Sequence, residues 1–243
     1  MALASAANAT IVTVFDGIAA GRTSFDSTVT AAGGTVVSDT WAGLSGGTSI
    51  DRGDYTITRN GGGSFWVSSY GSMSGQTVDI SPARNDGGWW DASGRTDPMD
   101  YYNAGVTLTF SSAINSIGFE VGDWATCCYD PVTELFISFD DGAPIKVASA
   151  TTWSQGLFPS QTNPASSVYE IFVAAFDDSG EFTKVSFWGN GLGEYLVFGG
   201  QVRYALLDEG SLPPIGDVPL PASSLLLLGG LGGIAALRRK RTK

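Results

Sequence analysis

Apolar and polar residues alternate along most of this chain, and this period of two constrains the fold more than any other feature of the sequence. Val106, Leu108 and Phe110 alternate with threonines, and residues 117–121 and 135–139 repeat the pattern. Successive side chains of a β-strand point to opposite faces of its sheet, so such runs are typical of half-buried strands. No run with the 3.6-residue period of an amphipathic helix is found before the C-terminal tail. The sequence therefore predicts an all-β domain.

Short turns that contain Asp and Gly separate these runs and predict how the strands pair. Asp140-Asp141-Gly142 and residues 177–180 each predict a hairpin, and the glycines at 61–63 predict that the strands on either side of them pair. Further strands are expected at residues 10–15, 35–37, 54–59, 64–67, 145–148, 168–176, 181–188, 194–198 and 202–206. Many short strands with such turns are typical of a jelly-roll-like β-sandwich, which we predict for residues 10–206.

The composition agrees with one ordered β domain and restricts its partners. Aromatic residues make up 12% of the chain, charged residues only 15%, and glycine occurs 33 times, which is unlike a disordered segment. The chain has 24 acidic and 13 basic residues, and five of the basic residues follow residue 237. The body of the chain is therefore strongly acidic, which argues against nucleic acid or an anionic lipid surface as its partner.

An uncharged stretch at residues 220–237 is followed directly by a basic cluster. As a helix it would be about 27 Å long, close to the hydrocarbon thickness of a bilayer. Basic clusters beside a membrane span stay in the cytoplasm, so we predict a short transmembrane helix at 220–237 with the body of the chain on the other side of the membrane. The alternative is a buried C-terminal helix of a soluble domain, but such a helix rarely ends in an abrupt basic cluster.

The order of motifs in residues 218–243 resembles the PEP-CTERM protein-sorting signal in its VPLPA variant. The residues that carry the resemblance are Val218, Pro219, Leu220, Pro221 and Ala222, followed by Arg238, Arg239, Lys240 and Arg241. The resemblance implies a transient anchor in the inner membrane of a Gram-negative bacterium, processed by an exosortase. It also implies that the mature protein reaches the cell surface or an extracellular polysaccharide matrix.

The first residues and the segment before the tail fit an exported protein. Ala7-Asn8-Ala9 has the A-x-A form of a signal-peptide cleavage site, although no basic or apolar region precedes it. We therefore predict that residues 1–9 are the remnant of a truncated signal peptide, the alternative being an ordinary disordered terminus. Residues 207–217 contain glycines and a Pro-Pro pair and are expected to be a linker.

Histidine is absent from the chain, which excludes several kinds of site. Ser-His-Asp and Cys-His catalysis and imidazole-ligated zinc all need this residue. A carboxylate pair could still hydrolyse glycans, and Glu120 with Asp123 is the most evident pair. Their odd separation places them on opposite faces of one strand, so no enzyme activity is expected. A carboxylate-dependent glycan hydrolase is the least favoured interpretation.

One loop combines acidic and aromatic residues at close spacing. Its candidate ligands are Asp86, Trp89, Trp90, Asp91, Asp97 and Asp100. Carboxylate oxygens separated by glycines suit Ca²⁺, and flat aromatic rings beside acids suit sugar rings. Structural packing of the loop is the third possibility, and Ca²⁺ is the one candidate cofactor of the chain. The other tryptophans, Trp41, Trp66, Trp153 and Trp188, are expected to pack in the core or at its rim.

Cys127 and Cys128 are the two cysteines of the chain, and they are adjacent. In an oxidising compartment they could close a strained vicinal disulfide. Two reduced thiols and bonds to another chain are the alternatives.

Together these observations predict an exported protein of the cell surface or extracellular matrix, with a structural or interaction role in the exopolysaccharide layer. The alternative is a lectin-like carbohydrate-binding module, with or without calcium. Its partners would be the processing enzyme, the inner membrane during transit, and extracellular polysaccharide.

Overall fold

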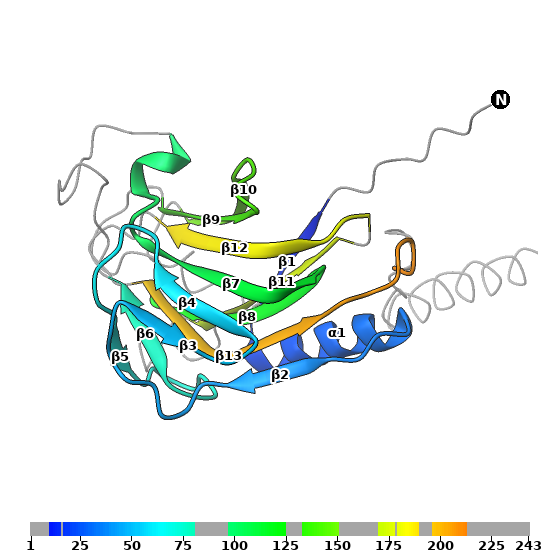
Figure 1. Ribbon diagram of the computed structural model, residues 1–243, viewed down its shortest axis with the longest axis horizontal. Coiled ribbons are helices and arrows are strands. Elements are labelled where there is room, and N and C mark those ends of the chain that lie inside the picture. The colour runs from blue at the N-terminus through cyan, green and yellow to red at the C-terminus, as the bar shows by residue number, and fades with distance from the viewer. Residues whose placement is uncertain are drawn as a thin grey trace, which may run out of the picture. The chain divides into compact units, whose positions relative to one another are not determined.

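The computed structural model describes residues 10–15, 17–80, 97–124, 133–150, 170–177, 179–189 and 196–212. In this part of the chain, antiparallel strands form two sheets that lie in two layers (Figure 1). The seven-stranded sheet has the order β1 (Ile11–Phe15), β11 (Glu170–Phe176), β8 (Ser116–Gly122), β13 (Leu196–Ala205), β6 (Thr77–Ile80) and β5 (Trp66–Ser68), and β2 (Val37–Thr40) also pairs with β13. The six-stranded sheet has the order β10 (Ile145–Ala150), β9 (Thr133–Phe139), β12 (Phe182–Gly189), β7 (Gly105–Ile114), β4 (Tyr55–Arg59) and β3 (Ser49–Asp51).

The core lies between the two sheets and is rich in aromatic rings. Phe119 of β8 packs edge-on against Phe187 of β12, with ring centroids 5.0 Å apart. Its ring is tilted against that of Phe198 of β13, with centroids 4.7 Å apart. All three side chains are fully buried. Because these rings come from both sheets, the prediction of a β-sandwich is confirmed, and both sheets are antiparallel.

Two predicted elements are found as expected. The N-terminal strand is β1, and Asp140-Asp141-Gly142 connects β9 to β10 as a hairpin. Asp140 and Asp141 have φ values of 46° and 59°, and the Gly142 N–H donates to the Phe139 carbonyl oxygen at 2.8 Å. This is a type I′ turn, whose twist matches that of the strands it joins.

The prediction that no helix precedes the tail was wrong, because α1 spans Ile18–Ala31. Its buried residues, Ile18, Gly21, Phe25 and Val29, do follow a helical period, but alanines, serines and threonines between them dilute the pattern. Gly21 faces Phe172 so closely that a Cβ at this position would lie 2.4 Å from the Phe172 Cβ. The helix covers the outer face of the seven-stranded sheet, the face turned away from the six-stranded sheet.

Two predicted strand pairings were wrong. The strands on either side of residues 177–180 do not form a hairpin, because β11 and β12 belong to different sheets. The strand after the glycines at 61–63 pairs with β6 rather than with β4. Turn composition shows that the chain reverses but does not show whether it stays in the same sheet.

Two strands were predicted at 194–198 and 202–206, but the described residues 196–198 and 202–205 belong to the single strand β13. Its register shifts between Gly199 and Val202, where Gly199 has φ 134° and Gly200 has φ 65°. The two glycines form a β-bulge, which a sequence reading takes for a turn.

The packed body of the domain runs past β13. Leu207, which the sequence places at the start of the linker, is buried, and its N–H and carbonyl are both bonded to the Asn115 side-chain amide at 2.8 Å. The compact unit extends to Ser211. Residues 213–217 of the predicted linker, the sorting motif and the predicted span at 220–237 lie outside the described residues, as does the predicted signal-peptide remnant. Within the described residues, no helix is long and apolar enough to cross a membrane.

Candidate functional site

Most of the candidate residues chosen from the sequence lie outside the described residues. These are Asp86, Trp89, Trp90 and Asp91 of the acidic loop, Cys127 and Cys128, and the sorting residues Val218–Ala222 and Arg238–Arg241. The calcium, disulfide and sorting hypotheses therefore stay predictions.

The described end of the acidic loop has a structural role. Asp97 caps the short 3₁₀ helix η1 (Pro98–Tyr101), since its Oδ1 accepts a hydrogen bond from the Met99 N–H at 2.9 Å. The Pro98 carbonyl accepts a bond from the indole N–H of the buried Trp188 at 2.8 Å. Asp100, inside η1, is partly exposed. Across the described ranges, no group of three or more acidic or cysteine side chains is placed to hold a metal ion.

A different aromatic residue is presented to solvent. Trp66 lies on β5, at the edge of the seven-stranded sheet, and 74% of its surface is exposed. The register explains its direction: Val67 pairs with the buried Val78 and packs against the core, so its neighbour Trp66 points to the outer face, beside Asp79. Trp41 and Trp188 are fully buried as predicted, but the prediction that Trp66 packs in the core or at its rim was wrong.

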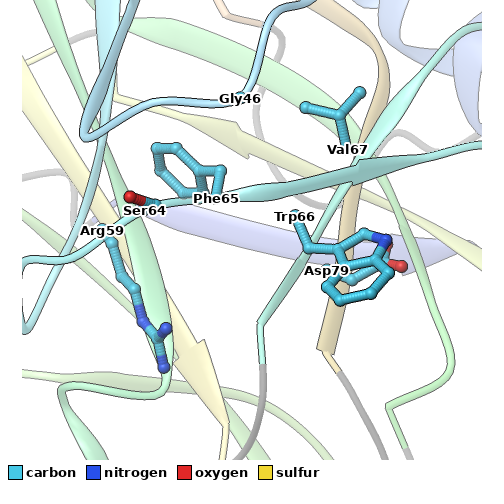
Figure 2. Close-up of a pocket in the computed structure, with 7 residues that line it drawn as sticks. All are labelled: Gly46, Arg59, Ser64, Phe65, Trp66, Val67 and Asp79. Carbon is cyan, nitrogen blue, oxygen red and sulfur yellow. The ribbon is translucent and has the colours of Figure 1, made fainter.

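Trp66 forms part of the wall of an open groove of about 600 Å³ (Figure 2). The lining residues are Gly46, Arg59, Ser64, Phe65, Trp66, Val67 and Asp79. Figure 2 shows Arg59 and Trp66 extending to the same side of β5, with Asp79 next to the indole ring on the side away from Arg59. The groove thus joins the end of β4 in one sheet to β5 and β6 in the other.

Asp79 is held in place by the two hydroxyl residues that share its face of the sheet. Its Oδ1 accepts hydrogen bonds from the Ser68 hydroxyl at 2.7 Å and from the Thr77 hydroxyl at 3.3 Å, and the two hydroxyls lie 2.8 Å apart. Both bonds go to the same oxygen, which leaves Oδ2 to accept a hydrogen bond from a ligand. An exposed indole beside an oriented carboxylate is an arrangement that can bind a sugar ring.

The loop at 69–76, which joins β5 to β6, is hydrogen-bonded to a buried carboxylate. Glu120 of β8 is fully buried on the outer face. Its Oε2 accepts the Ser74 N–H and its Oε1 accepts the Ser74 hydroxyl, both at 2.8 Å. Arg22 of α1 approaches Oε1 to 3.8 Å. Burial raises the pKa of Glu120, and the bonds from Ser74 and the charge of Arg22 only partly oppose this rise.

A second carboxylate repeats this arrangement two residues away in the loop. Glu170 of β11 accepts hydrogen bonds from both the N–H and the hydroxyl of Ser72. Met73, between the two serines, packs against Ile18 and Val197. Two adjacent strands thus hold residues 69–76, and this connection begins and ends at the strands that carry Trp66 and Asp79.

Glu120 therefore has a structural role. With its two oxygens bonded to Ser74 and no exposed surface, it has no access to a substrate. Asp123, its suggested partner, lies beyond the end of β8 with φ 50°. One signal in the sequence could have indicated Trp66. In the run 64–68 it occupies the same face as Ser64 and Ser68, whereas Phe65 and Val67 occupy the apolar face.

Comparison with known protein families and with curated proteins gives no match. Among solved structures, the chain is similar to one described as "Carbohydrate binding module family29", with 11% sequence identity. The alignment covers 87% of this chain and 99% of that protein, with a TM-score of 0.24. A superposition of this quality does not establish a shared fold.

Proposed function

We propose that this β-sandwich is a non-catalytic carbohydrate-binding domain whose sugar platform is Trp66. The observation that supports the proposal is an indole with 74% of its surface exposed on a regular edge strand, beside the fixed carboxylate of Asp79. A pyranose ring has an apolar face of C–H groups and a rim of hydroxyls. The indole would stack on the first, and Asp79 Oδ2 would accept hydrogen bonds from the second.

The edge position of β5 suits a polymeric ligand. In the described part of the seven-stranded sheet no strand lies beyond β5, so no paired strand borders Trp66 on that side. The lining of the groove includes residues of β4, β5 and β6, so we expect it to accommodate more than one sugar of a polysaccharide.

Isothermal titration calorimetry with a panel of neutral and acidic polysaccharides tests this proposal. Wild-type protein should bind at least one of them, Trp66→Phe should weaken that binding, and Trp66→Ala should abolish it. Leu206→Ala is the matched control, because Leu206 is 53% exposed but does not line the groove. Removing an exposed side chain should leave the melting temperature nearly unchanged. Binding that survives Trp66→Ala would refute the assignment of the platform.

We also propose that the domain is exported and displayed in an extracellular polysaccharide layer, through a C-terminal anchor of the PEP-CTERM type. The support is the resemblance of residues 218–243 to that signal, and a polysaccharide-binding domain would have its ligand in such a layer. The jelly-roll description belongs to the same proposal, and it is supported by the alternation of β11, β12 and β13 between the two sheets.

Cell fractionation tests the sorting proposal. The chain, with a restored leader and an internal tag, should lose its tail and reach the surface in a host that has an exosortase. Replacing Pro219 and Pro221 by alanine should leave the tail uncleaved. Wild-type protein that stays full-length in the cytosol would refute this proposal and leave the sugar platform untouched.

A further inference from the structure

The groove has opposite charges on the two sides of its aromatic platform. Asp79 lies beside the indole, and Arg59 extends from the end of β4 on the other side of it (Figure 2). Arg59 is also the one basic residue that lines the groove among the described residues. A ligand stacked on Trp66 would therefore meet a hydrogen-bond acceptor at one end and a cation at the other.

The position of Arg59 in its strand is unusual for a charged residue. Tyr55 and Ile57 occupy the inward-facing positions of β4 and are almost fully buried. Arg59 continues the same phase and pairs with the buried Val106, where an apolar side chain would be expected. Arg59 is the last residue of β4, and at this position its side chain lines the groove.

We infer that the groove recognises an acidic polysaccharide in which a neutral sugar lies on Trp66 and the neighbouring sugar carries a carboxylate that binds Arg59. This inference rests on the proposed sugar-binding function and names its ligand class. A guanidinium binds a carboxylate through two parallel N–H···O bonds, and its five N–H donors allow it to keep an intramolecular bond as well.

The acidic character of the chain does not prevent this contact. The chain has 24 acidic and 13 basic residues, so a polyanion is repelled at long range. At physiological salt this repulsion is screened beyond about 8 Å, whereas the Arg59–carboxylate contact acts at hydrogen-bond distance. The expected result is slow association with a stable contact once the sugar is bound.

Asp79 sets a limit on the charge pattern of the ligand. A carboxylate on the sugar that stacks on Trp66 would face the carboxylate of Asp79 and be repelled. A polymer with a charge on every sugar should therefore bind less well than one in which neutral and acidic sugars alternate.

Calorimetry with three oligosaccharides of equal length tests the inference: a neutral one, one that alternates neutral sugars with uronates, and one made only of uronates. Wild-type protein should bind the alternating ligand about tenfold more tightly than the neutral one, as expected for a charge-assisted bidentate contact. Arg59→Gln should remove this preference and keep the affinity for the neutral ligand. Lys146→Gln removes an exposed positive charge from β10, at the far edge of the six-stranded sheet, and should change neither value.

The outcomes separate the inference from the function on which it rests. Equal binding of the neutral and alternating ligands, both lost in Trp66→Ala, would overturn the inference and keep the sugar platform. No binding of any of the three would overturn both. If Arg59→Gln melts at a lower temperature than wild type, a salt titration of the wild-type protein replaces it. The preference for the alternating ligand should then shrink at about 1 M salt, and a preference that does not depend on salt would overturn the inference.

Discussion

Ser74 binds Glu120 twice, through its backbone N–H and through its hydroxyl, both at 2.8 Å. The carboxylate lies inside the protein, yet a protonated acid or an amide could satisfy the same two groups. The N–H needs an acceptor, and the Ser74 hydroxyl can donate or accept. The fold therefore needs the shape and hydrogen-bonding capacity of Glu120 more than it needs the charge.

Glu120→Gln should change the free energy of unfolding by less than about 1 kcal/mol, whereas Glu120→Ala should cost about 2 to 4 kcal/mol. The alanine variant leaves a cavity and removes both acceptors of Ser74. Urea denaturation measures the two values. Glu134→Ala, which breaks the surface pair with Lys146, is the control and should cost about 0.5 kcal/mol or less. Equal losses in the two Glu120 variants would show that the charge itself is required.

Unfolding of wild-type protein and of Glu120→Gln should respond differently to pH. Burial raises the pKa of Glu120, so the folded state binds the proton more tightly than the unfolded state, in which the pKa is about 4.3. The stability that this adds is complete below the unfolded pKa and is lost as the pH rises through the folded pKa. Glu120→Gln should therefore gain stability relative to wild type as the pH rises from about 4 to 7.

The measurement is a denaturation series at several pH values, with the difference between the two proteins plotted against pH. Asp39 does not disturb this window. Although burial alone would raise its pKa, hydrogen bonds from Arg52 and Tyr55 outweigh burial and lower it, so its contribution is lost only at more acidic pH. A difference that is constant with pH would contradict a raised pKa of Glu120.

Alanine at Gly200 should be much more costly than alanine at Gly210. Both glycines have positive φ, 65° and 71°, so each substitution strains the backbone by about 1 kcal/mol. At Gly200 the new Cβ would also lie 2.2 Å from Glu120 Oε2, whereas nothing lies within 4 Å at Gly210. We expect a total loss above about 3 kcal/mol for Gly200→Ala. Thermal melts of both variants give the comparison, and similar melting temperatures would refute the steric argument.

Removing the hydroxyl of Tyr55 should destabilise the domain more than removing that of Tyr204. The Tyr55 hydroxyl accepts the Trp41 indole N–H at 2.7 Å and donates to Asp39 Oδ2 at 2.6 Å. Tyr55→Phe leaves that buried indole unpaired and should cost about 2 to 3 kcal/mol. The Tyr204 hydroxyl donates to Asp54 at 2.6 Å, so Tyr204→Phe should cost about 1 kcal/mol. Guanidinium denaturation measures both, and the reverse order would contradict this account.

The calcium hypothesis for the acidic loop predicts a melting temperature that is higher with Ca²⁺ than with a chelator. Stabilisation by a bound ligand grows with its concentration, so the shift should increase as Ca²⁺ is titrated. Asp91→Asn should abolish the shift, while Asp97→Ala should mainly weaken the cap of η1. Identical melting curves with Ca²⁺ and with chelator would refute calcium binding.

The sequence predicts those parts of the fold in which local pattern and tertiary environment agree. Strands β7, β8 and β9 alternate clearly, and the β9–β10 turn has residues that tolerate positive φ. Helix α1 was missed because alanines, serines and threonines dilute its apolar period, and one of its buried positions is Gly21, whose small size allows contact with Phe172. The joining of β11 to β12 across two sheets was missed because strand pairing is a property of the whole fold.

The candidate site was harder to predict than the fold. The sequence does not distinguish an exposed tryptophan from a buried one. Only the register of β5 with β6 shows that Trp66 faces outward. The sequence shows Glu120 only as the most evident partner for Asp123 in a carboxylate pair, and the contacts of Ser74 in the loop at 69–76 show that it is a buried structural residue. The exposure of Trp66 and the burial of Glu120 both depend on contacts between segments that are distant in the sequence, so a local sequence pattern does not predict them.

The last described strand of the chain, β13, lies in the middle of its sheet, between β8 and β6. A nascent polypeptide that has not yet released these residues from the ribosome leaves both neighbours with unpaired edges. The domain thus completes its folding only after synthesis has passed residue 205.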